Sequence, residues 1–362
     1  MSARPILIMA GGTGGHVFPA LALARLLRQR SQAVVWLGTR RGLEARVVPA
    51  EQIEIEWLAI AGLRGKGLLA LLVAPFRLIR ALAQALAVMR RHRPLAVVGL
   101  GGFVSGPGGL AAWLARRPLI IHEQNAVAGL TNRILAHLAR EVLEAFPGSF
   151  GPGVRARAIG NPVRADIAAT RAPATRYGER TGPIRLLVVG GSQGAARLNA
   201  VVPQALAELG AIPAFEVRHQ CGAAHLEGAE RAYARAGITA SVTAFIDDMA
   251  AAYAWADLVV CRAGALTISE LAAAGLPAVL VPFPAAVDDH QTANARFLVS
   301  AGAAVLIADR ELTPARLAAE LRRLGADRAA LLAMAERARA LARPHAAEAL
   351  AEACTRHAAE AA

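Results

Sequence analysis

Short apolar runs alternate along this chain with longer stretches rich in alanine, leucine and arginine. Such alternation is typical of β–α–β units, in which parallel strands form a sheet and helices cover both of its faces. Ligands of these sheets bind at the carboxyl ends of the strands, so function is expected in the residues that follow each strand. The clearest predicted strands are Ile6–Met9, Ala33–Leu37, Leu95–Gly99, Leu119–His122, Ile184–Gly190, Phe215–His219, Asp257–Cys261 and Ala278–Val281.

Two glycine-rich segments, each between a predicted strand and a predicted helix, begin two similar halves of the chain. They are GGTGGH at residues 11–16 and GGSQGA at residues 190–195. A chain of 362 residues also exceeds the ~250 at which a single core usually divides. We therefore predict an α/β protein with a Rossmann-like domain over residues 1–162, a second over 163–343, and a final helix over 344–362 that packs back on the first domain.

The net charge of +13 is unevenly distributed. Residues 1–163 hold 20 arginines and lysines against 7 glutamates, and the rest of the chain is balanced. The excess favours an anionic partner for the first half, such as nucleic acid, a phosphorylated substrate or an acidic membrane. Aromatic residues make up only 4% of the chain, and no nucleic-acid-binding motif occurs among the basic residues. We therefore expect no nucleic-acid partner.

The cysteines and the apolar segments bear on the cellular compartment. Cys221, Cys261 and Cys354 lie far apart without metal-binding spacing, which favours neither a disulfide framework nor a zinc site. The chain starts with a strand rather than the apolar core of a signal peptide. The uncharged run Gly67–Phe76 has 10 residues, well short of the ~20 of a spanning helix. These features predict a cytoplasmic chain without a transmembrane segment.

The first glycine-rich segment, Gly11–His16, lacks side chains where backbone N–H groups could approach an anion, and a helix is expected from about Pro19 to Gln29. The positive end of that helix keeps a nearby imidazole neutral, so His16 could accept a proton from a hydroxyl. The alternatives are a tight turn without a ligand and a histidine that only packs. The segment does not match the NAD fingerprint, although Arg40 and Arg41 leave NADP as a minor alternative.

Two further groups follow strands of the first half. Gly99–Gly109 is rich in glycine, although a structural turn explains that segment equally well. His122, Glu123, Gln124 and Asn125 are four consecutive polar residues after an apolar strand, a pattern more typical of a functional loop than of solvated surface.

In the second half, Arg262–Glu270 follows a strand and opens a helix. Glu270 could accept two hydrogen bonds from a ribose diol, but Thr267 and Glu270 also have the spacing of a capping box. Gln291 and Asn294 would share one face of a helix and could bind sugar hydroxyls. We expect no metal at the adjacent Asp288 and Asp289, which are more typical of a solvent-facing loop.

Eight ordered segments carry a resemblance to a known family: GGTGGH, GGFVSGPGG, HEQN, GNPVR, GGSQGA, FIDDMAAAYAWAD, RAGALTISE and DDHQTAN. Together they resemble the MurG family, the UDP-N-acetylglucosamine–N-acetylmuramyl-(pentapeptide) pyrophosphoryl-undecaprenol N-acetylglucosaminyltransferases of peptidoglycan synthesis. The match spans essentially residues 5–345. The resemblance implies the GT-B architecture, with two Rossmann-like doubly wound parallel-sheet domains facing a cleft. It places the lipid acceptor on the first domain and UDP-N-acetylglucosamine (UDP-GlcNAc) mostly on the second.

The resemblance also implies which residues bind the donor: Thr13, Gly14, Gly15, Asn125, Arg164, Ser192, Ile246, Ala265, Leu266, Thr267, Ile268, Ser269, Glu270 and Gln291. Arg164 and the Ser192 loop would neutralise the diphosphate, and Ile246 would offer backbone groups to uracil. Glu270 would hold the ribose, while Gln291 and Asn294 would select the hydroxyls of the sugar. Residues 288–294 depart from the family pattern, which is richer there in glutamine and aromatic residues.

The implied reaction is an inverting transfer of N-acetylglucosamine to the 4-hydroxyl of undecaprenyl-pyrophosphoryl-MurNAc-pentapeptide. His16 is the expected base and Glu123 the second candidate. Arg164 and helix N-termini would take the place of a metal, so no cofactor is expected. The alternatives are another GT-B nucleotide-sugar enzyme, such as an epimerase, and a nucleotide-sugar-binding protein without catalysis.

The lipid acceptor implies a peripheral position at the cytoplasmic face of the bacterial plasma membrane. The expected contact with the anionic membrane surface is the run Leu68–Phe76, flanked by Arg64, Lys66, Arg77 and Arg80. The alternative is that its leucines form the core face of an ordinary helix.

Overall fold

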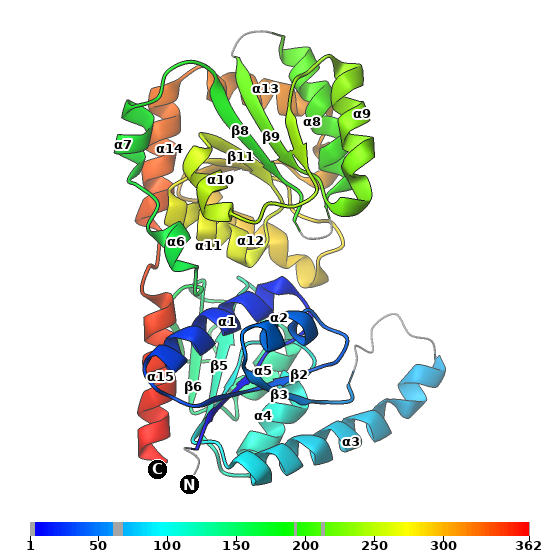
Figure 1. Ribbon diagram of the computed structural model, residues 1–362, viewed down its shortest axis with the longest axis vertical. Coiled ribbons are helices and arrows are strands. Elements are labelled where there is room, and N and C mark those ends of the chain that lie inside the picture. Colours follow the sequence, from blue (N-terminus) through cyan, green and yellow to red (C-terminus); the bar gives the residue numbers. More distant parts are fainter. Residues whose placement is uncertain (1–3, 61–67, 192–193, 211–213, 362) are drawn as a thin grey trace. The chain divides into compact units, whose positions relative to one another are not determined.

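The structure is a computed structural model that describes residues 4–60, 68–191, 194–210 and 214–361 (Figure 1). The chain forms two compact units. Unit 1 consists of Met1–Val163 with Arg343–Ala362, and unit 2 of Arg164–Ala342. Each unit contains one fully parallel sheet with helices around it, which confirms the predicted fold class.

The sheet of unit 1 has seven strands in the order β3-β2-β1-β4-β5-β6-β7. Their bounds are β1 Ile6–Met9, β2 Val34–Gly38, β3 Glu54–Trp57, β4 Ala96–Gly99, β5 Leu119–Glu123, β6 Glu141–Glu144 and β7 Ala156–Ala158. The helices are α1 Gly14–Gln29, α2 Glu44–Ala50, α3 Leu68–His92, α4 Ser105–Leu114, α5 Leu130–Ala136 and α15 Ala346–Glu360.

The sheet of unit 2 has six strands in the order β10-β9-β8-β11-β12-β13. They are β8 Ile184–Val189, β9 Phe215–Gln220, β10 Ser241–Thr243, β11 Leu258–Cys261, β12 Ala278–Leu280 and β13 Ala304–Leu306. The α-helices are α6 Ala165–Ala168, α7 Pro173–Gly178, α8 Ala196–Leu209, α9 Leu226–Ala236, α10 Met249–Trp255, α11 Ala265–Ala274, α12 His290–Val299, α13 Pro314–Gly325 and α14 Arg328–Ala340.

The central strand β1 shows why the apolar runs lie at the middle of a sheet. Its four residues are all buried, because side chains that alternate along a strand meet helices on both faces. Ile6 and Ile8 belong to the core under α1 and α15, whereas Leu7 and Met9 belong to the core that includes residues of α3 and α4. The final helix α15 packs on α1 and β4 of unit 1.

The first helix begins earlier than the sequence predicts. We expected it from about Pro19, but α1 starts at Gly14 and Pro19 lies inside it as a buried residue. The second half of the glycine-rich segment is therefore the first turn of a helix rather than a loop. This places His16 in that first turn.

Helix α3 has two different halves. Ala81, Ala85 and Met89 are buried against the sheet, whereas Phe76 and Ile79 are 73% and 66% exposed. Figure 1 shows the start of α3 extending away from the rest of unit 1. Within the described residues, no helix has both the length and the apolar character that crossing a membrane requires.

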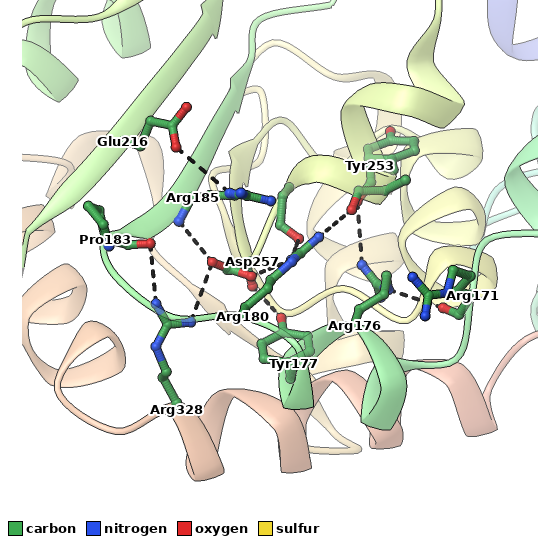
Figure 2. Close-up of polar contacts among 12 residues, drawn as sticks. Arg171, Arg176, Tyr177, Arg180, Pro183, Arg185, Glu216, Tyr253, Asp257 and Arg328 are labelled. Atoms are coloured by element: carbon green, nitrogen blue, oxygen red, sulfur yellow. Dashed lines mark hydrogen bonds and ion pairs between the residues drawn. The ribbon is translucent and has the colours of Figure 1, made fainter.

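The buried carboxylate of Asp257, just before β11, is the centre of a network of polar contacts in unit 2 (Figure 2). Its oxygens pair with the guanidinium of Arg180 and accept a hydrogen bond of 2.9 Å from the backbone N–H of Arg185. Arg328 of α14 lies 3.7 Å away, and the hydroxyl of Tyr177 donates to the backbone carbonyl of Asp257. One aspartate thus connects segments that are far apart in the sequence.

Candidate active site

The carboxyl ends of β1, β4 and β5 lie side by side in unit 1, because these strands are adjacent and parallel. The two glycine-rich segments of the first half meet there. A Cβ atom on Gly102 would lie only 2.3 Å from the carbonyl oxygen of Gly11, and φ of Gly102 is +83°. Only glycine permits this approach.

The first glycine-rich segment is supported by Glu44, a residue that the sequence did not single out. This buried carboxylate accepts hydrogen bonds from the backbone N–H of Gly12 at 2.9 Å and from the backbone and hydroxyl of Thr39. Thr13 is the N-cap of α1, and its side chain makes no capping hydrogen bond. The N–H groups of Gly14 and Gly15 follow in the first turn, where backbone donors have no partner within the helix. This end of the helix suits an anion.

His16 is the third residue of α1 and is half-buried. Its Nδ1 lies 2.9 Å from Oε1 of Gln124, at the end of β5. A Cβ atom on Gly101 would come within 2.7 Å of the imidazole ring, so this glycine makes room for the ring. The structure therefore brings together His16, the glycine-rich segment Gly99–Gly109 and the HEQN residues 122–125. This follows from the adjacent positions of β1, β4 and β5 in the sheet.

Glu123 has a different environment from that expected of a base. Its Oε1 accepts from the backbone and side-chain amides of Asn125, at 2.9 and 3.2 Å. Its Oε2 accepts from the backbone N–H of Gly129 and from Nδ2 of Asn132, at 3.2 and 2.9 Å. A carboxylate accepts about four hydrogen bonds, so this buried group has no lone pair left for a substrate. The geometry argues against Glu123 as the base and favours a role in fixing the loop after β5.

In unit 2 the carboxyl ends of β8, β11 and β12 are likewise adjacent. Helix α11 follows β11 with Gly264 as its N-cap, and no side chain caps it. Thr267 lies inside the helix, so the capping-box alternative for Thr267 and Glu270 is wrong. The N–H groups of Ala265 and Leu266 stand at the start of the helix, where an anion would be stabilised.

Glu270 lies one turn further along α11. Its Oε2 accepts a hydrogen bond of 3.0 Å from the hydroxyl of Tyr253. Burial raises the pKa of Glu270 to about 7, against the lowering effects of Tyr253 and Arg164. Tyr253 is a further residue that the sequence analysis did not single out, since it lies in an alanine-rich helix.

Arg164 precedes the short helix α6, with its Nε 3.5 Å from Asp166. Its Nε and Nη2 atoms are buried and make no hydrogen bond to any described residue. Buried guanidinium nitrogens without hydrogen bonds are costly, which is consistent with a site for an anionic ligand.

Gln291 and Asn294 of α12 both bond to the segment after β11. Oε1 of Gln291 accepts from the backbone N–H groups of Ala263 and Phe283, at 3.2 and 2.9 Å. Nδ2 of Asn294 donates to the carbonyl of Ala263 at 3.2 Å, and this side chain is fully buried. The burial argues against the expected contact of Asn294 with a sugar and favours a supporting role.

Of the remaining residues expected to bind the donor, one lies outside the described residues and three can be described. Ser192 lies outside the described residues. Ile246 lies between β10 and α10, is partly buried, and its backbone groups make no hydrogen bond to the described residues. Ile268 is buried in α11, and the hydroxyl of Ser269 donates to the carbonyl of Ala265 at 3.0 Å.

The chain matches two family models, the glycosyltransferase family 28 N-terminal domain over residues 6–144 and its C-terminal domain over residues 185–350. It is 60% identical to a protein of Nitrosococcus oceani, over 96% of this chain and 97% of that one. It is also 60% identical to a protein of Alkalilimnicola ehrlichii, over 97% and 98%. Both relatives are named UDP-N-acetylglucosamine–N-acetylmuramyl-(pentapeptide) pyrophosphoryl-undecaprenol N-acetylglucosamine transferase.

The structure is similar to the crystal structure of Acinetobacter baumannii MurG, with a TM-score of 0.86 and 41% identity over 98% of this chain and 99% of that one. Its likeness to the calicheamicin glycosyltransferase CalG4, at a TM-score of 0.68 and 19% identity, concerns the fold alone. The two parallel-sheet units thus have the GT-B fold of such glycosyltransferases. By sequence and by structure, the chain belongs to glycosyltransferase family 28 and, within it, to the MurG family of N-acetylglucosaminyltransferases.

Proposed function

We propose that this chain transfers N-acetylglucosamine from UDP-GlcNAc to the 4-hydroxyl of undecaprenyl-pyrophosphoryl-MurNAc-pentapeptide, with inversion at the anomeric carbon. The observation that carries the proposal is the 60% identity to relatives that bear this name over nearly their whole length. The polar residues at the carboxyl ends of β1, β4 and β5 support it, because they include a histidine suited to act as a base.

The chemical step needs a base and a stabilised leaving group. His16 has a partner at Nδ1, and its Nε2 makes no hydrogen bond to the described residues. The acceptor hydroxyl would give its proton to this nitrogen as its oxygen bonds to the anomeric carbon. The bond from that carbon to the diphosphate breaks at the same time, and its electron pair leaves with UDP. General-base assistance of this kind contributes ~10²–10⁴-fold to a rate.

Unit 2 provides groups for the donor. Arg164 and the start of α11 would stabilise the diphosphate without a metal, since oriented donors stabilise developing negative charge. The backbone of Ile246 would bind uracil, and Glu270 would accept hydrogen bonds from the ribose hydroxyls. Oε1 of Gln291 accepts two backbone hydrogen bonds, so its amide nitrogen would be the group that contacts the sugar.

The exposed start of α3 supports a peripheral position on an anionic membrane. Val73, Phe76, Leu78 and Ile79 are all exposed, with Arg77 and Arg80 among them. The exposure of Phe76 supports the membrane contact, and Ala74 of the same run is buried. The structure does not describe the side chains of Leu68, Leu69 and Leu72, and Arg64 and Lys66 lie outside the described residues. Binding through α3 would place unit 1 beside a pyrophosphate held at the cytoplasmic leaflet.

The test is transfer by the purified chain with UDP-GlcNAc and the solubilised lipid acceptor, followed by UDP release and by the mass of the lipid product. We expect UDP and a lipid heavier by one N-acetylhexosamine, only when the acceptor is present. Conversion of UDP-GlcNAc to an epimer without acceptor would support the epimerase alternative. Binding of UDP-GlcNAc without either product would support a binding protein.

A further inference from the structure

A chain of hydrogen bonds leads from a backbone carbonyl to His16 in unit 1. Nε2 of His122 lies 2.9 Å from the carbonyl oxygen of Gly160. Nδ1 of His122 lies 3.0 Å from the amide nitrogen of Gln124, and Oε1 of Gln124 lies 2.9 Å from Nδ1 of His16. Four groups from three separate segments are therefore connected in series.

The direction of every bond follows from the first one. The Gly160 carbonyl can only accept, so Nε2 of His122 must carry a proton. Complete burial lowers the pKa of His122, which keeps the ring neutral and leaves its Nδ1 as an acceptor. The group facing Nδ1 must then be the NH₂ of Gln124, and the same nitrogen also donates to the carbonyl of His122 at 3.0 Å.

This orientation of the amide determines the state of His16. With its nitrogen turned to His122, Gln124 presents Oε1 to His16, and an amide oxygen can only accept. Nδ1 of a neutral His16 therefore carries the proton, and the lone pair lies on Nε2. When Nε2 takes up a proton, the bond from Nδ1 to Gln124 stays as it is, so nothing has to rearrange during the reaction.

This hydrogen-bond relay, from the carbonyl of Gly160 through His122 and Gln124 to His16, lies in a buried part of unit 1. His122 and Gln124 are 0% and 1% exposed, and Nδ2 of Asn161 donates to the backbone carbonyl of Gln124 at 3.1 Å. Gly160 has a φ of +89°, and a Cβ atom there would lie 2.4 Å from Cβ of Arg343. The two hydrogen bonds of the Gln124 amide nitrogen, to Nδ1 and to the carbonyl of His122, fix the orientation of the amide.

We propose that Gln124 is the positioning residue of the transfer reaction: it transmits the fixed tautomer of His122 to His16 and so places the reactive lone pair of His16 on Nε2. The kinetic part of this inference rests on the proposed role of His16 as the base. The tautomer itself follows from the hydrogen bonds alone and can be measured without any activity.

None of the charged groups described on the neighbouring elements determines the tautomer of His16 in place of Gln124. On β5, Glu123 is saturated by its four donors, and His122 is neutral. Under the first glycine-rich segment, Glu44 is occupied by Gly12 and Thr39. Among the described residues, Gln124 is the one side chain that bonds to the imidazole of His16.

The direct test is nitrogen NMR of the wild-type chain labelled with ¹⁵N-histidine, at about pH 8, where an ordinary histidine is neutral. The signals of His16 are identified by their loss in His16→Ala. We expect the tautomer that carries its proton on Nδ1. A neutral His16 with its proton on Nε2 would overturn the proposal, whatever the activity of the chain.

The kinetic test compares Gln124→Met with Gln124→Glu. Both variants lose the amide donor to His122, but only the glutamate keeps an acceptor for His16. We expect Gln124→Met to lower kcat by about 10- to 100-fold with little change in the KM for UDP-GlcNAc, because the base is no longer oriented. Gln124→Glu should recover part of kcat and move the acid limb of the pH–rate profile up by about one unit, since a carboxylate stabilises the imidazolium.

Gln204→Met, at an exposed position of α8 in unit 2, is the matched control and should behave as wild type. Equal activities and pH profiles for wild type and Gln124→Met would contradict the positioning role. If Gln124→Met does not fold, the NMR measurement on the wild-type chain still decides. If His16→Ala keeps full activity while the tautomer is as expected, the base assignment fails and the hydrogen-bond relay stands.

Discussion

Tyr253 donates a hydrogen bond of 3.0 Å to Oε2 of Glu270, across the space between α10 and α11. The bond holds a carboxyl group whose pKa burial raises to about 7. Such a group is partly protonated near neutral pH, and a ligand that donates hydrogen bonds to it favours its ionised form. Binding of the donor is therefore expected to change the protonation of Glu270, and this change can be measured.

Glu270→Ala should raise the dissociation constant for UDP at least about tenfold, or about 1.4 kcal/mol, because the ribose hydroxyls lose a charged acceptor. Calorimetric titration measures the change. Glu208→Ala, at an exposed position of α8, is the control. A lower melting temperature with unchanged UDP affinity would mean that Glu270 only stabilises unit 2.

The affinity for UDP-GlcNAc should rise with pH between about 6 and 8. Below pH 7 the free protein carries a proton on Glu270, because its folded-state pKa is about 7 and not the usual 4.5, and binding must release that proton. Calorimetry in two buffers of different ionisation enthalpy detects the release. Glu270→Gln should abolish it, and equal proton release in that variant would exclude Glu270 as its source.

The same raised pKa makes a prediction for stability. Between pH 4.5 and about 7 the folded protein holds a proton on Glu270 that the unfolded chain has lost. The contribution of this group to the free energy of unfolding therefore falls as pH rises through that range. Chemical denaturation of wild type and Glu270→Gln over this range should show a smaller decline in the variant.

His16→Ala should lower turnover by ~10²–10⁴-fold and leave the dissociation constant of UDP-GlcNAc nearly unchanged. The reason is that the proposed base would act on the acceptor hydroxyl and not on the donor. Rates with saturating lipid acceptor, together with a donor titration, separate the two effects. Unchanged turnover would remove His16 as the base.

Asp257→Asn should lower the free energy of unfolding of unit 2 by ~3–5 kcal/mol, because it removes the buried carboxylate that pairs with the partly buried guanidinium of Arg180. Hydrogen exchange of the backbone amides of β8 and β11 in increasing urea reports on this unit. Asp247→Asn, at an exposed position without a bonded partner among the described residues, should change little. Equal effects of both substitutions would show that the network in Figure 2 does not stabilise the fold.

Replacing Arg77 and Arg80 by glutamate should weaken binding to vesicles that contain acidic lipid, because each arginine near such a surface contributes ~1 kcal/mol. Co-sedimentation at several salt concentrations measures the effect. The control is the same reversal at Arg235 and Arg310 of unit 2. Equal binding of wild type to neutral vesicles would exclude electrostatic attachment.

The sequence predicted every inner strand of the two sheets except β6, and it predicted none of the edge strands. Ile6–Met9 agrees with the prediction at both ends, because a strand flanked by neighbours on both sides is a continuous apolar run. Three of the four edge strands, β3, β7 and β10, mix polar or charged residues with apolar ones and are only partly buried. The fourth, β13, is apolar but only three residues long. A local apolar pattern does not mark such strands.

The site was predictable in its location but not in its internal bonding. The β–α–β pattern predicts that the strands are parallel and that their carboxyl ends share one edge of the sheet, and the observed strand order brings His16 and the HEQN residues together there. The saturation of Glu123 depends on Asn132, nine residues away and on another element. The support from Glu44 depends on a bond that spans 32 residues. No local spacing encodes such partners.

Unit 1 is built from both ends of the chain. Leu350, Ala351 and Cys354 of α15 belong to the same buried core as Ile6 and Leu21. The part of the protein that is synthesised first can therefore be completed only last, after all of unit 2 has left the ribosome. A fragment that stops at Val163 would expose the apolar surface of α1 and β4 that α15 covers, so we expect unit 1 not to fold when the chain is simply truncated after it.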